Sequence, residues 1–337
     1  MRDPQAERAR RLLCALQNRI RADLRHARGM HRVAAVAAED TIYAVDRVSE
    51  RSILRWLAEH WPRTWPVELV MEGLAPGTTF PRGTPVAATR HRLILDPIDG
   101  TRMLMHDKRS AWSLAGLAPQ RGPRTTLEDI FVAAMTELPT TKAGWGDQLS
   151  AVRGRGLTAT RIDLRSGRRV KFQPRPSRAR RLEHGFASFA KFFPEGKGRL
   201  AGWEEELWRG LAAPEGGNGR AVFDDQYISS GGQLYELIAG HDRFVADLRP
   251  LVFAQLRMKS ALTCHPYDLC TALVAREAGC IIESPDGGPL AVTLDLTTPV
   301  AWVGYANAAL RRRIRPALRG LLRRAVSEPA RRSSRGR

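Results

Sequence analysis

Apolar residues recur at helical spacing in the first part of the chain. They stand three, four or seven positions apart at Leu12, Leu13, Leu16, Ile20 and Leu24, and again at Val48, Ile53, Leu54 and Leu57. Such spacing places the apolar side chains on one face of a helix, where they can be buried. We therefore expect two helices between about residues 5 and 58.

Short apolar runs follow, separated by segments rich in proline and glycine, and these runs predict buried strands. The first two are VELVM (67–71) and RLILD (92–96), and they lead into the acidic residues Glu72 and Asp96. Further strands are expected at 111–118, 130–137, 243–248, 280–284 and 299–306, and further helices at about 199–212, 230–240, 267–278 and 306–325.

The order of these elements predicts the fold class. Strands and helices are interspersed without the regular alternation of a doubly wound sheet, which favours a layered α/β structure of the α+β kind. The chain shows no internal repeat. We expect an N-terminal α+β half over 1–140, a C-terminal α/β half over 141–310 and a basic helix end and tail over 311–337. The boundary between the halves is expected within 140–185 or at 213–219.

The composition predicts a globular protein with a large buried core. The 337 residues are 43% apolar and 26% charged, which excludes acidic disordered and collagen-like chains. No run of about 18 apolar residues is present, and the charged start lacks the apolar run of a signal peptide. We therefore expect no membrane span and a cytoplasmic protein. The four cysteines have no metal or disulfide-scaffold spacing, so they are expected to be reduced and mostly buried.

Positive charge is concentrated in two segments. The chain has 54 Lys and Arg against 35 Asp and Glu, a formal net charge of +19. Residues 311–337 contain eleven arginines, and residues 153–181 contain ten. A solvated tail and a contact with nucleic acid or an acidic membrane both fit such a run. Because no aromatic residue interleaves the arginines of the tail, any nucleic-acid contact there would be salt-sensitive and independent of sequence.

The densest chemical signal is LILDPIDGT at residues 93–101. Asp96 and Asp99 stand three residues apart across a proline, so both carboxylates can face one pocket, and Ile98 between them can offer its backbone carbonyl. Hard oxygen ligands at the end of a buried strand suit Mg²⁺, which keeps water and substrate phosphate at its other positions. Taken alone, the pattern also fits an ordinary turn.

The longer string DPIDGT, with the strand before it, resembles the inositol monophosphatase family of Mg²⁺-dependent phosphatases, which includes fructose-bisphosphatase-like and nucleotide-phosphate phosphatases. The family's second signature is similar to Tyr267-Asp268 followed by Glu277-Ala278-Gly279. Glu72 in VMEGL and Asp46 in YAVDRVSE match two further family positions. The resemblance implies alternating helix and sheet layers, with the active site between two halves.

The resemblance also implies a site for two to three Mg²⁺ ions. Its ligands would be Glu72, Asp96 and the Ile98 carbonyl in the first metal site, and Asp96, Asp99 and Asp268 in the second. Such paired ions would neutralise the phosphate, lower the pKa of a bound water and stabilise the leaving alkoxide.

Catalytic and phosphate-binding roles are implied for the residues next to these ligands. Thr101, with Asp46 or Glu72 close to it, would orient or deprotonate the attacking water. The backbone amides of Gly100 and Thr101 would bind phosphate oxygens where a helix begins.

The chain departs from the usual family pattern at several positions, none of which removes a proposed ligand. The chain has Gly73 where the family usually has Glu, Arg102 where it has Thr, Tyr267 where it has Trp, and Cys280 where it has Gly. The interval from Asp268 to Glu277 is also one residue shorter than in the usual pattern. Arg102 could clamp a second anionic group or point to solvent.

Substrate selection is expected to depend on two further segments. Ala261 stands where inositol-selective relatives place an acidic residue, and Arg257 and Lys259 lie nearby. This weakens an inositol interpretation and suits a second phosphate, although a solvated basic loop fits equally well. The turn Ser229–Gly232, with Gly231 and Gly232, would bind a substrate hydroxyl or phosphate, or would cap the helix that follows. His265 is interpreted as structural.

These features predict a Mg²⁺-dependent phosphomonoesterase acting on a small phosphate ester, such as an inositol phosphate or another sugar or nucleotide phosphate. The alternative is a weak or inactive relative that binds nucleic acid or an acidic partner through its basic surfaces. A degenerate enzyme should have lost at least one ligand, and the set is complete, which favours the enzyme. Because homodimers are common in the family, we expect a homodimer.

Overall fold

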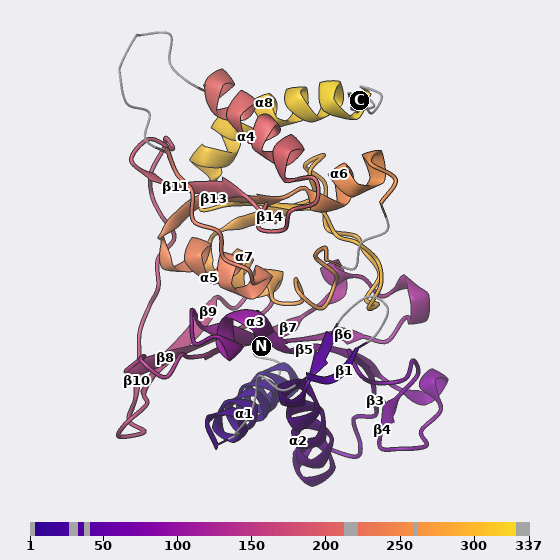
Figure 1. Cartoon of the computed structure of the whole chain (residues 1–337). Helices are drawn as coiled ribbons and strands as arrows, with labels where there is room; N and C mark the ends of the chain where they lie inside the picture. The colour runs from indigo at the N-terminus through magenta and orange to yellow at the C-terminus, as the bar shows by residue number, and fades with distance from the viewer. Residues whose placement is uncertain (1–3, 27–32, 37–40, 212–221, 259–261, 328–337) are drawn as a thin grey trace.

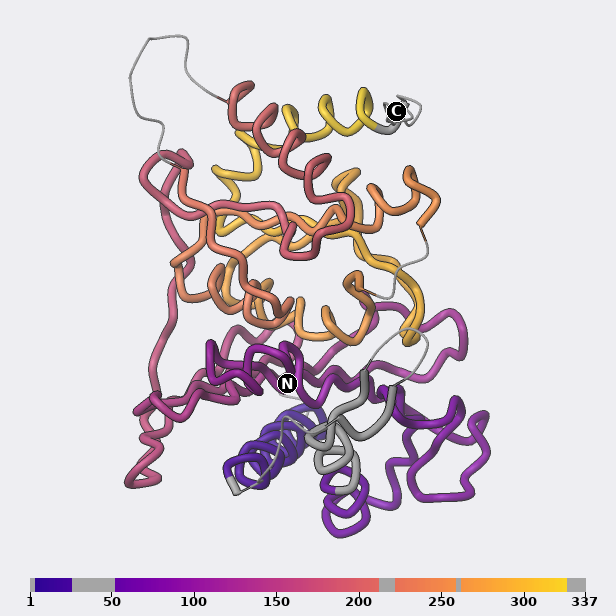
Figure 2. The backbone as a smooth tube through the Cα atoms, viewed as in Figure 1, coloured from indigo at the N-terminus to yellow at the C-terminus, as the bar shows by residue number. Residues whose placement is uncertain are grey.

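The computed structural model describes residues 4–26, 33–36, 41–211, 222–258 and 262–327. Of the described residues between 26 and 51, and of residues 326 and 327, it describes the backbone alone. Layers of helices alternate with two β-sheets from one end of the molecule to the other, as Figures 1 and 2 show. The layered α/β fold class predicted from the order of elements is therefore confirmed.

The first layer consists of α1 (Pro4–His26) and α2 (Ala44–His60), which pack against each other and against one face of the first sheet (Figure 1). Leu13, Leu16 and Ile20 of α1 are fully buried, as their spacing predicted. The two N-terminal helices are confirmed. The short hairpin of β1 (Val33–Val36) and β2 (Thr41–Tyr43), which lies between them in the chain, was not predicted.

The first sheet has eight strands in the order β10-β9-β8-β7-β6-β5-β3-β4. Only β3 and β5 pair in parallel among these described strands; the other neighbours are antiparallel. The strands are β3 (Val67–Met71), β4 (Thr79–Phe80), β5 (His91–Asp99), β6 (Ala111–Pro119), β7 (Val132–Leu138), β8 (Trp145–Val152), β9 (Leu157–Asp163) and β10 (Arg169–Lys171).

The first sheet extends past residue 140, where the boundary between the halves was expected. Its last strands, β8 to β10, were not predicted because their buried positions are partly polar. Asp147 of β8 is almost fully buried, and it is bound by Arg161 of β9 through Nε at 2.6 Å. The chain leaves this sheet after Lys171 and enters the second sheet at Gly185, within the broader boundary region 140–185.

The second sheet has five strands in the order β12-β11-β13-β15-β14. Its strands are β11 (Gly185–Phe189), β12 (Val222–Phe223), β13 (Asp242–Asp247), β14 (Ile281–Glu283) and β15 (Trp302–Tyr305). Strand β11 is parallel to β12 and β13, whereas β15 is antiparallel to both of its neighbours. Central strands β13 and β15 are buried throughout most of their length, in line with their predicted apolar runs.

Helices α5 (Ser230–Ala239) and α7 (Ala272–Ala278) lie between the two sheets, and α4 (Lys197–Leu211) and α8 (Ala308–Ser327) cover the outer face of the second (Figure 1). Two shorter helices are α3 (Thr101–Met105) and α6 (Arg249–Gln255), and 3-10 turns occupy Val86–Ala88, Gly122–Arg124 and Leu127–Asp129. Helix α7 is shorter than predicted, because residues 267–271 form turns.

The core has two parts, one on each side of the first sheet. Leu13 and Leu93 belong to the part beneath α1 and α2, and Trp112 and Phe244 belong to the part between and beyond the sheets. The cysteines are free thiols, and three of the four are buried, as expected. Among the described residues, no helix has the length and apolarity that a bilayer crossing requires.

Candidate active site

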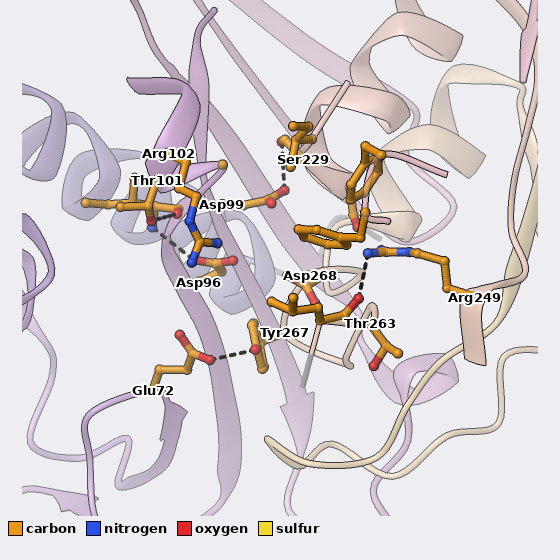
Figure 3. Close-up of a pocket in the computed structure, with 17 residues that line it drawn as sticks. Glu72, Asp96, Asp99, Thr101, Arg102, Ser229, Arg249, Thr263, Tyr267 and Asp268 are labelled. Carbon is orange, nitrogen blue, oxygen red and sulfur yellow. Dashed lines mark hydrogen bonds between the residues drawn. The ribbon is translucent and has the colours of Figure 1, made fainter. Parts of the chain in front are cut away.

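A cavity of about 180 Å³ opens between the two halves at the end of β5 (Figure 3). Its lining comes from the end of β5 and the start of α3 on one side, and from the starts of α5 and α6 and residues 262–268 on the other. Segments far apart in the chain therefore build this cavity, and four of its lining residues are acidic: Glu72, Asp96, Asp99 and Asp268.

Asp96 and Asp99 reach the cavity from the irregular end of β5. The pairing of β5 with β6 shifts register between Asp96 and Asp99, and the amide of Ile98 donates to Asp96 Oδ1 at 2.9 Å. Gly100 follows with a φ of 92° and turns the chain into α3. A Cβ at this glycine would lie 3.1 Å from Ser229 Cβ, so both its conformation and the close approach favour glycine.

Asp268 joins these two carboxylates from the other half of the molecule. Its Oδ2 accepts the amide of His265 at 2.6 Å, which fixes the side chain within the turn that precedes α7. Carboxylate oxygens of Asp96, Asp99 and Asp268 lie within 4.8 Å of one another. This convergence of three hard oxygen donors fits a divalent cation such as Mg²⁺.

The electrostatics of the three carboxylates also favour a cation. Burial raises the pKa of Asp96 well above its usual value, and the charges of Asp99 and Asp268 raise it further. Burial likewise raises the pKa of Asp268, and it raises that of Asp99 to about 6 despite the hydrogen bonds from Gly231 and Ser229. Each shift means that the negative form is disfavoured without a nearby positive charge. A bound divalent cation would supply that charge.

Glu72 lies in the same cavity but outside this group of three. It follows directly after β3, and its Oε1 accepts the hydroxyl of Tyr267 at 2.6 Å (Figure 3). The negative charge of Glu72 contributes to the raised pKa of both Asp96 and Asp268. The structure therefore brings all four expected carboxylate ligands to one cavity.

Thr101 and Arg102 begin α3 and line the cavity beside the carboxylates. The Thr101 hydroxyl donates to the Ile98 carbonyl at 2.8 Å, so one lone pair of that carbonyl is already used. Arg102 is exposed, and its guanidinium points toward Asp96 rather than away into solvent (Figure 3).

The turn before α5 supports Asp99 from behind. Ser229 Oγ and the amide of Gly231 both donate to Asp99 Oδ2, at 2.9 and 2.5 Å, and the amide of Gly232 donates to Ser229 Oγ at 2.8 Å. Ser229 is thus the N-cap of α5, as one of the two interpretations of this turn predicted. Gly231 and Gly232 do not line the cavity, and their amides orient protein groups rather than facing a substrate.

The structure does not describe the side chains of several predicted residues. Asp46 lies in α2, where only the backbone is described, and Lys259 and Ala261 lie in the undescribed segment before residue 262. Glu277 of the second motif is described and is structural, because its carboxylate accepts the amides of Gly154 and Gly156 at 2.6 and 2.7 Å.

Sequence reasoning missed three residues on one side of the cavity, Arg249, Phe192 and Phe193. Ile228 and Leu262 beside them lie in the two segments that were expected to select the substrate. Arg249 is 4% exposed and binds Asp247 through Nε at 2.8 Å. The three missed residues come from the ends of β11 and β13, and nothing in their local pattern marks them. Each of them follows an apolar strand in the chain, β11 or β13, and that position is the one sequence signal that could have indicated them.

Solved structures of known proteins share this architecture. SuhB of Bartonella henselae, an extragenic suppressor protein, matches with a TM-score of 0.59 at 18% identity, over 91% of this chain and 95% of that one. Fructose-1,6-bisphosphatase of Leishmania major matches with a TM-score of 0.61 at 14% identity, over 92% of each chain. An IMPase of Thermotoga maritima matches with a TM-score of 0.58 at 15% identity, over 96% and 99%.

No family model matches the sequence, and no curated protein matches it. At identities of 14 to 18%, the likeness to solved structures establishes the fold. The resemblance carried by the two motifs is therefore confirmed at that level: the chain has the fold shared by the inositol monophosphatase and fructose-1,6-bisphosphatase structures.

Proposed function

We propose that the chain is a Mg²⁺-dependent phosphomonoesterase that hydrolyses a small phosphorylated metabolite. One observation carries the proposal: Asp96, Asp99 and Asp268, from both halves, converge within 4.8 Å in a cavity that also contains Glu72. Two buried carboxylates and a third that is partly buried destabilise one another at this spacing unless a cation is present. Metal binding next to an open cavity explains this arrangement.

The residues that would hold the metal are Asp96, Asp99, Asp268, Glu72 and the carbonyl of Ile98. When bound, Mg²⁺ would neutralise phosphate charge and make a water molecule more acidic. The protein contributes orientation. Asp99 is held by Ser229 and Gly231, and Glu72 is held by Tyr267, so neither carboxylate rotates freely.

Thr101 is proposed to orient the attacking water. Because its hydroxyl proton is donated to the Ile98 carbonyl, the Thr101 oxygen presents lone pairs to the cavity and accepts a hydrogen bond from water. Asp46 is the proposed partner for this water. Gly100 and Thr101 amides and the Arg102 guanidinium are proposed to hold the phosphate oxygens. Water attacks phosphorus, the ester P–O bond breaks, and a proton ends on the leaving oxygen, so that an alcohol and inorganic phosphate form.

Part of the clustered positive charge has structural partners within the chain. Arg161 binds Asp147, and Arg311 binds Glu283 through Nε at 2.7 Å. Arg313 donates to the Leu211 carbonyl at 3.0 Å, and Arg324 pairs with Glu206 at 2.7 Å. The arginine runs therefore do not by themselves favour a nucleic-acid-binding function over the enzyme.

The cytoplasmic location rests on the composition and the homodimer on the family resemblance, and both stay part of the proposal. Sedimentation velocity of the full-length protein measures its oligomeric state directly. A species of 37.5 kDa at all concentrations would contradict the homodimer.

The proposed activity is tested by phosphate release from a panel of esters: inositol phosphates, sugar bisphosphates, 3′,5′-nucleotide bisphosphates and histidinol phosphate. Each is assayed with Mg²⁺ and with EDTA at fixed ionic strength. Release that EDTA abolishes and Mg²⁺ restores is the expected result. Release from no member, in a folded protein saturated with Mg²⁺, would overturn the proposal and make salt-dependent nucleic-acid binding the next assay.

A further inference from the structure

One side of the cavity is lined mainly by apolar and aromatic side chains. It is formed by Phe192 and Phe193, which follow β11, with Ile228, Leu262 and the buried Arg249. We call these five residues the aromatic wall. The acidic residues among the described lining residues are the four expected metal ligands, so none of the five residues of the wall has a carboxylate side chain.

We propose that the aromatic wall is the leaving-group subsite and that it selects phosphate esters whose leaving group carries a flat aromatic or heteroaromatic ring, as a nucleoside does. This inference rests on the proposed phosphomonoesterase function and names its substrate class. It predicts discrimination against polyol phosphates, among which inositol phosphates are the obvious competitors.

Arg249 packs against the aromatic rings and is paired within the protein rather than acting as a free cation. Its guanidinium carbon lies 4.4 Å from the ring centre of Phe192 and 5.4 Å from that of Phe193. Asp247 neutralises it through two hydrogen bonds, and Nη1 donates to the Leu262 carbonyl at 2.8 Å. The rings of Phe192 and Phe193 lie 4.9 Å apart at 68° to each other, so an aromatic ring bound here would contact the face of one and the edge of the other.

The wall is held rigidly before any ligand binds. Lys191, next to Phe192, is buried, and its Nζ forms ion pairs with Glu204 at 2.8 Å and with Asp224 at 2.5 Å. The amide of Lys191 also donates to Gln226 Oε1 at 2.9 Å. Because these contacts fix the loop, a ring that binds here orders few additional groups, and more of its contact energy is retained as affinity.

The hydroxyl groups beside the aromatic wall already have partners within the protein, and Thr263 Oγ1, which also lines the cavity, lies 3.5 Å from His265 Nε2. Ser229 Oγ donates to Asp99 and accepts from Gly232, and Ser230 Oγ donates to Cys264 Sγ at 3.6 Å. Asp247 is fully buried against Arg249 and does not line the cavity. A polyol would therefore replace few of its hydrogen bonds to water here, whereas the faces of an aromatic ring form no strong hydrogen bonds that stacking would remove.

The test compares three phosphate monoesters that differ in leaving group: adenosine 3′-monophosphate, inositol 1-phosphate and glycerol 2-phosphate. Full-length protein is assayed with saturating Mg²⁺ at fixed ionic strength. We expect kcat/KM for the adenosine ester to exceed that for inositol 1-phosphate on the order of tenfold, the size of a base-stacking contribution. Equal values, or a preference for inositol 1-phosphate, would overturn the inference.

Substitutions in the wall show whether the ring contact is responsible. Phe192→Ala and Phe193→Ala are expected to raise KM for the adenosine ester about tenfold and to leave glycerol 2-phosphate within about twofold. Phe192→Leu and Phe193→Leu keep much of the apolar volume but remove the flat ring. They replace the alanine variants in this test if an alanine variant folds poorly. The matched control is Phe223→Ala, because Phe223 is an exposed phenylalanine of β12 outside the cavity. A uniform effect on all three esters would contradict ring recognition.

Failure of the proposed function can be told apart from failure of this inference. If no ester is hydrolysed, the phosphatase proposal fails, and binding of the same three esters is then measured by titration calorimetry with Mg²⁺ present. Tighter binding of the adenosine ester that Phe193→Ala removes would uphold the subsite. Binding that does not depend on the ring, or no binding, would overturn it.

Discussion

The hydroxyl of Tyr267 donates a hydrogen bond to Oε1 of Glu72 at 2.6 Å and so joins residues 195 positions apart. The bond connects the turn after β3 with the turn before α7, across the cavity between the two halves (Figure 3). It fixes one oxygen of Glu72 and the orientation of the other. Where the family pattern has tryptophan, this chain therefore has a hydroxyl donor that supports a proposed metal ligand.

Removing this donor is expected to weaken metal binding. In Tyr267→Phe, Glu72 loses its partner, and we expect the Mg²⁺ concentration that gives half-maximal activity to rise about 10- to 100-fold. A Mg²⁺ titration of phosphate release measures this. The control is Tyr235→Phe, whose hydroxyl donates to Asp147 at 2.6 Å and does not line the cavity. An unchanged Mg²⁺ dependence in Tyr267→Phe would contradict the supporting role.

Substitution of Asp96 is expected to remove activity without loss of stability. Asp96→Asn removes the carboxylate that is proposed to bind metal in both sites. Loss of a residue that only supports a metal ligand typically costs up to about 100-fold, so loss of this ligand should lower the rate of phosphate release by more than that. Burial and neighbouring charges raise the pKa of Asp96, so the neutral amide should not lower the melting temperature of the metal-free protein. Substantial turnover by the folded variant would refute the metal assignment.

Asp242, outside the active site, is expected to make stability depend on pH. Burial raises its pKa to about 7, with further contributions from Glu236 and Asp225. Because the folded-state pKa lies above the unfolded one, stability is fully present below about pH 4 and is lost as the pH rises through 7.

Asp242→Asn should therefore stabilise the protein more at pH 8 than at pH 5, by about 2 kcal/mol. Urea unfolding at the two pH values measures the difference in the free energy of unfolding. Glu195→Gln, at an exposed position, is the control and should show no such difference. The same gain at both pH values would exclude Asp242 as the titrating group.

Arg21 is a buried cation whose guanidinium lacks a carboxylate partner among the described residues. Its Nη1 has no hydrogen-bond partner, Nη2 donates to Asn18 Oδ1 at 2.7 Å, and burial lowers its pKa to about 10. Replacing such a charge with an apolar side chain of similar length is expected to stabilise the fold.

We expect Arg21→Met to raise the free energy of unfolding by about 1 to 3 kcal/mol, as measured in urea. Arg25→Met, at an exposed position on the same helix, should change it by less than about 0.5 kcal/mol. A loss of stability in Arg21→Met would show that its hydrogen bond to Asn18 outweighs the cost of burying the charge.

Elements with a regular apolar pattern were predictable from the chain. Strand β3 was predicted at its exact bounds, and α1 was predicted from Leu13, Leu16 and Ile20, because burial of alternate or helically spaced side chains leaves a local pattern. Strands β8 and β9 were not predicted, because ion pairs such as that between Asp147 and Arg161 allow polar residues to occupy buried positions in these strands. Polar pairs across strands leave no apolar pattern in either strand.

The sequence by itself indicated Asp96, Ile98 and Asp99 as candidate metal ligands, because they are close in the chain at one strand end, and the family resemblance added Glu72 and Asp268. Only the tertiary structure decided what surrounds them. The Tyr267–Glu72 bond and the support of Asp99 by the turn before α5 depend on contacts between distant segments. The aromatic wall depends in the same way on how β11 and β13 end side by side, and such contacts follow from the packing of the whole chain rather than from any local pattern.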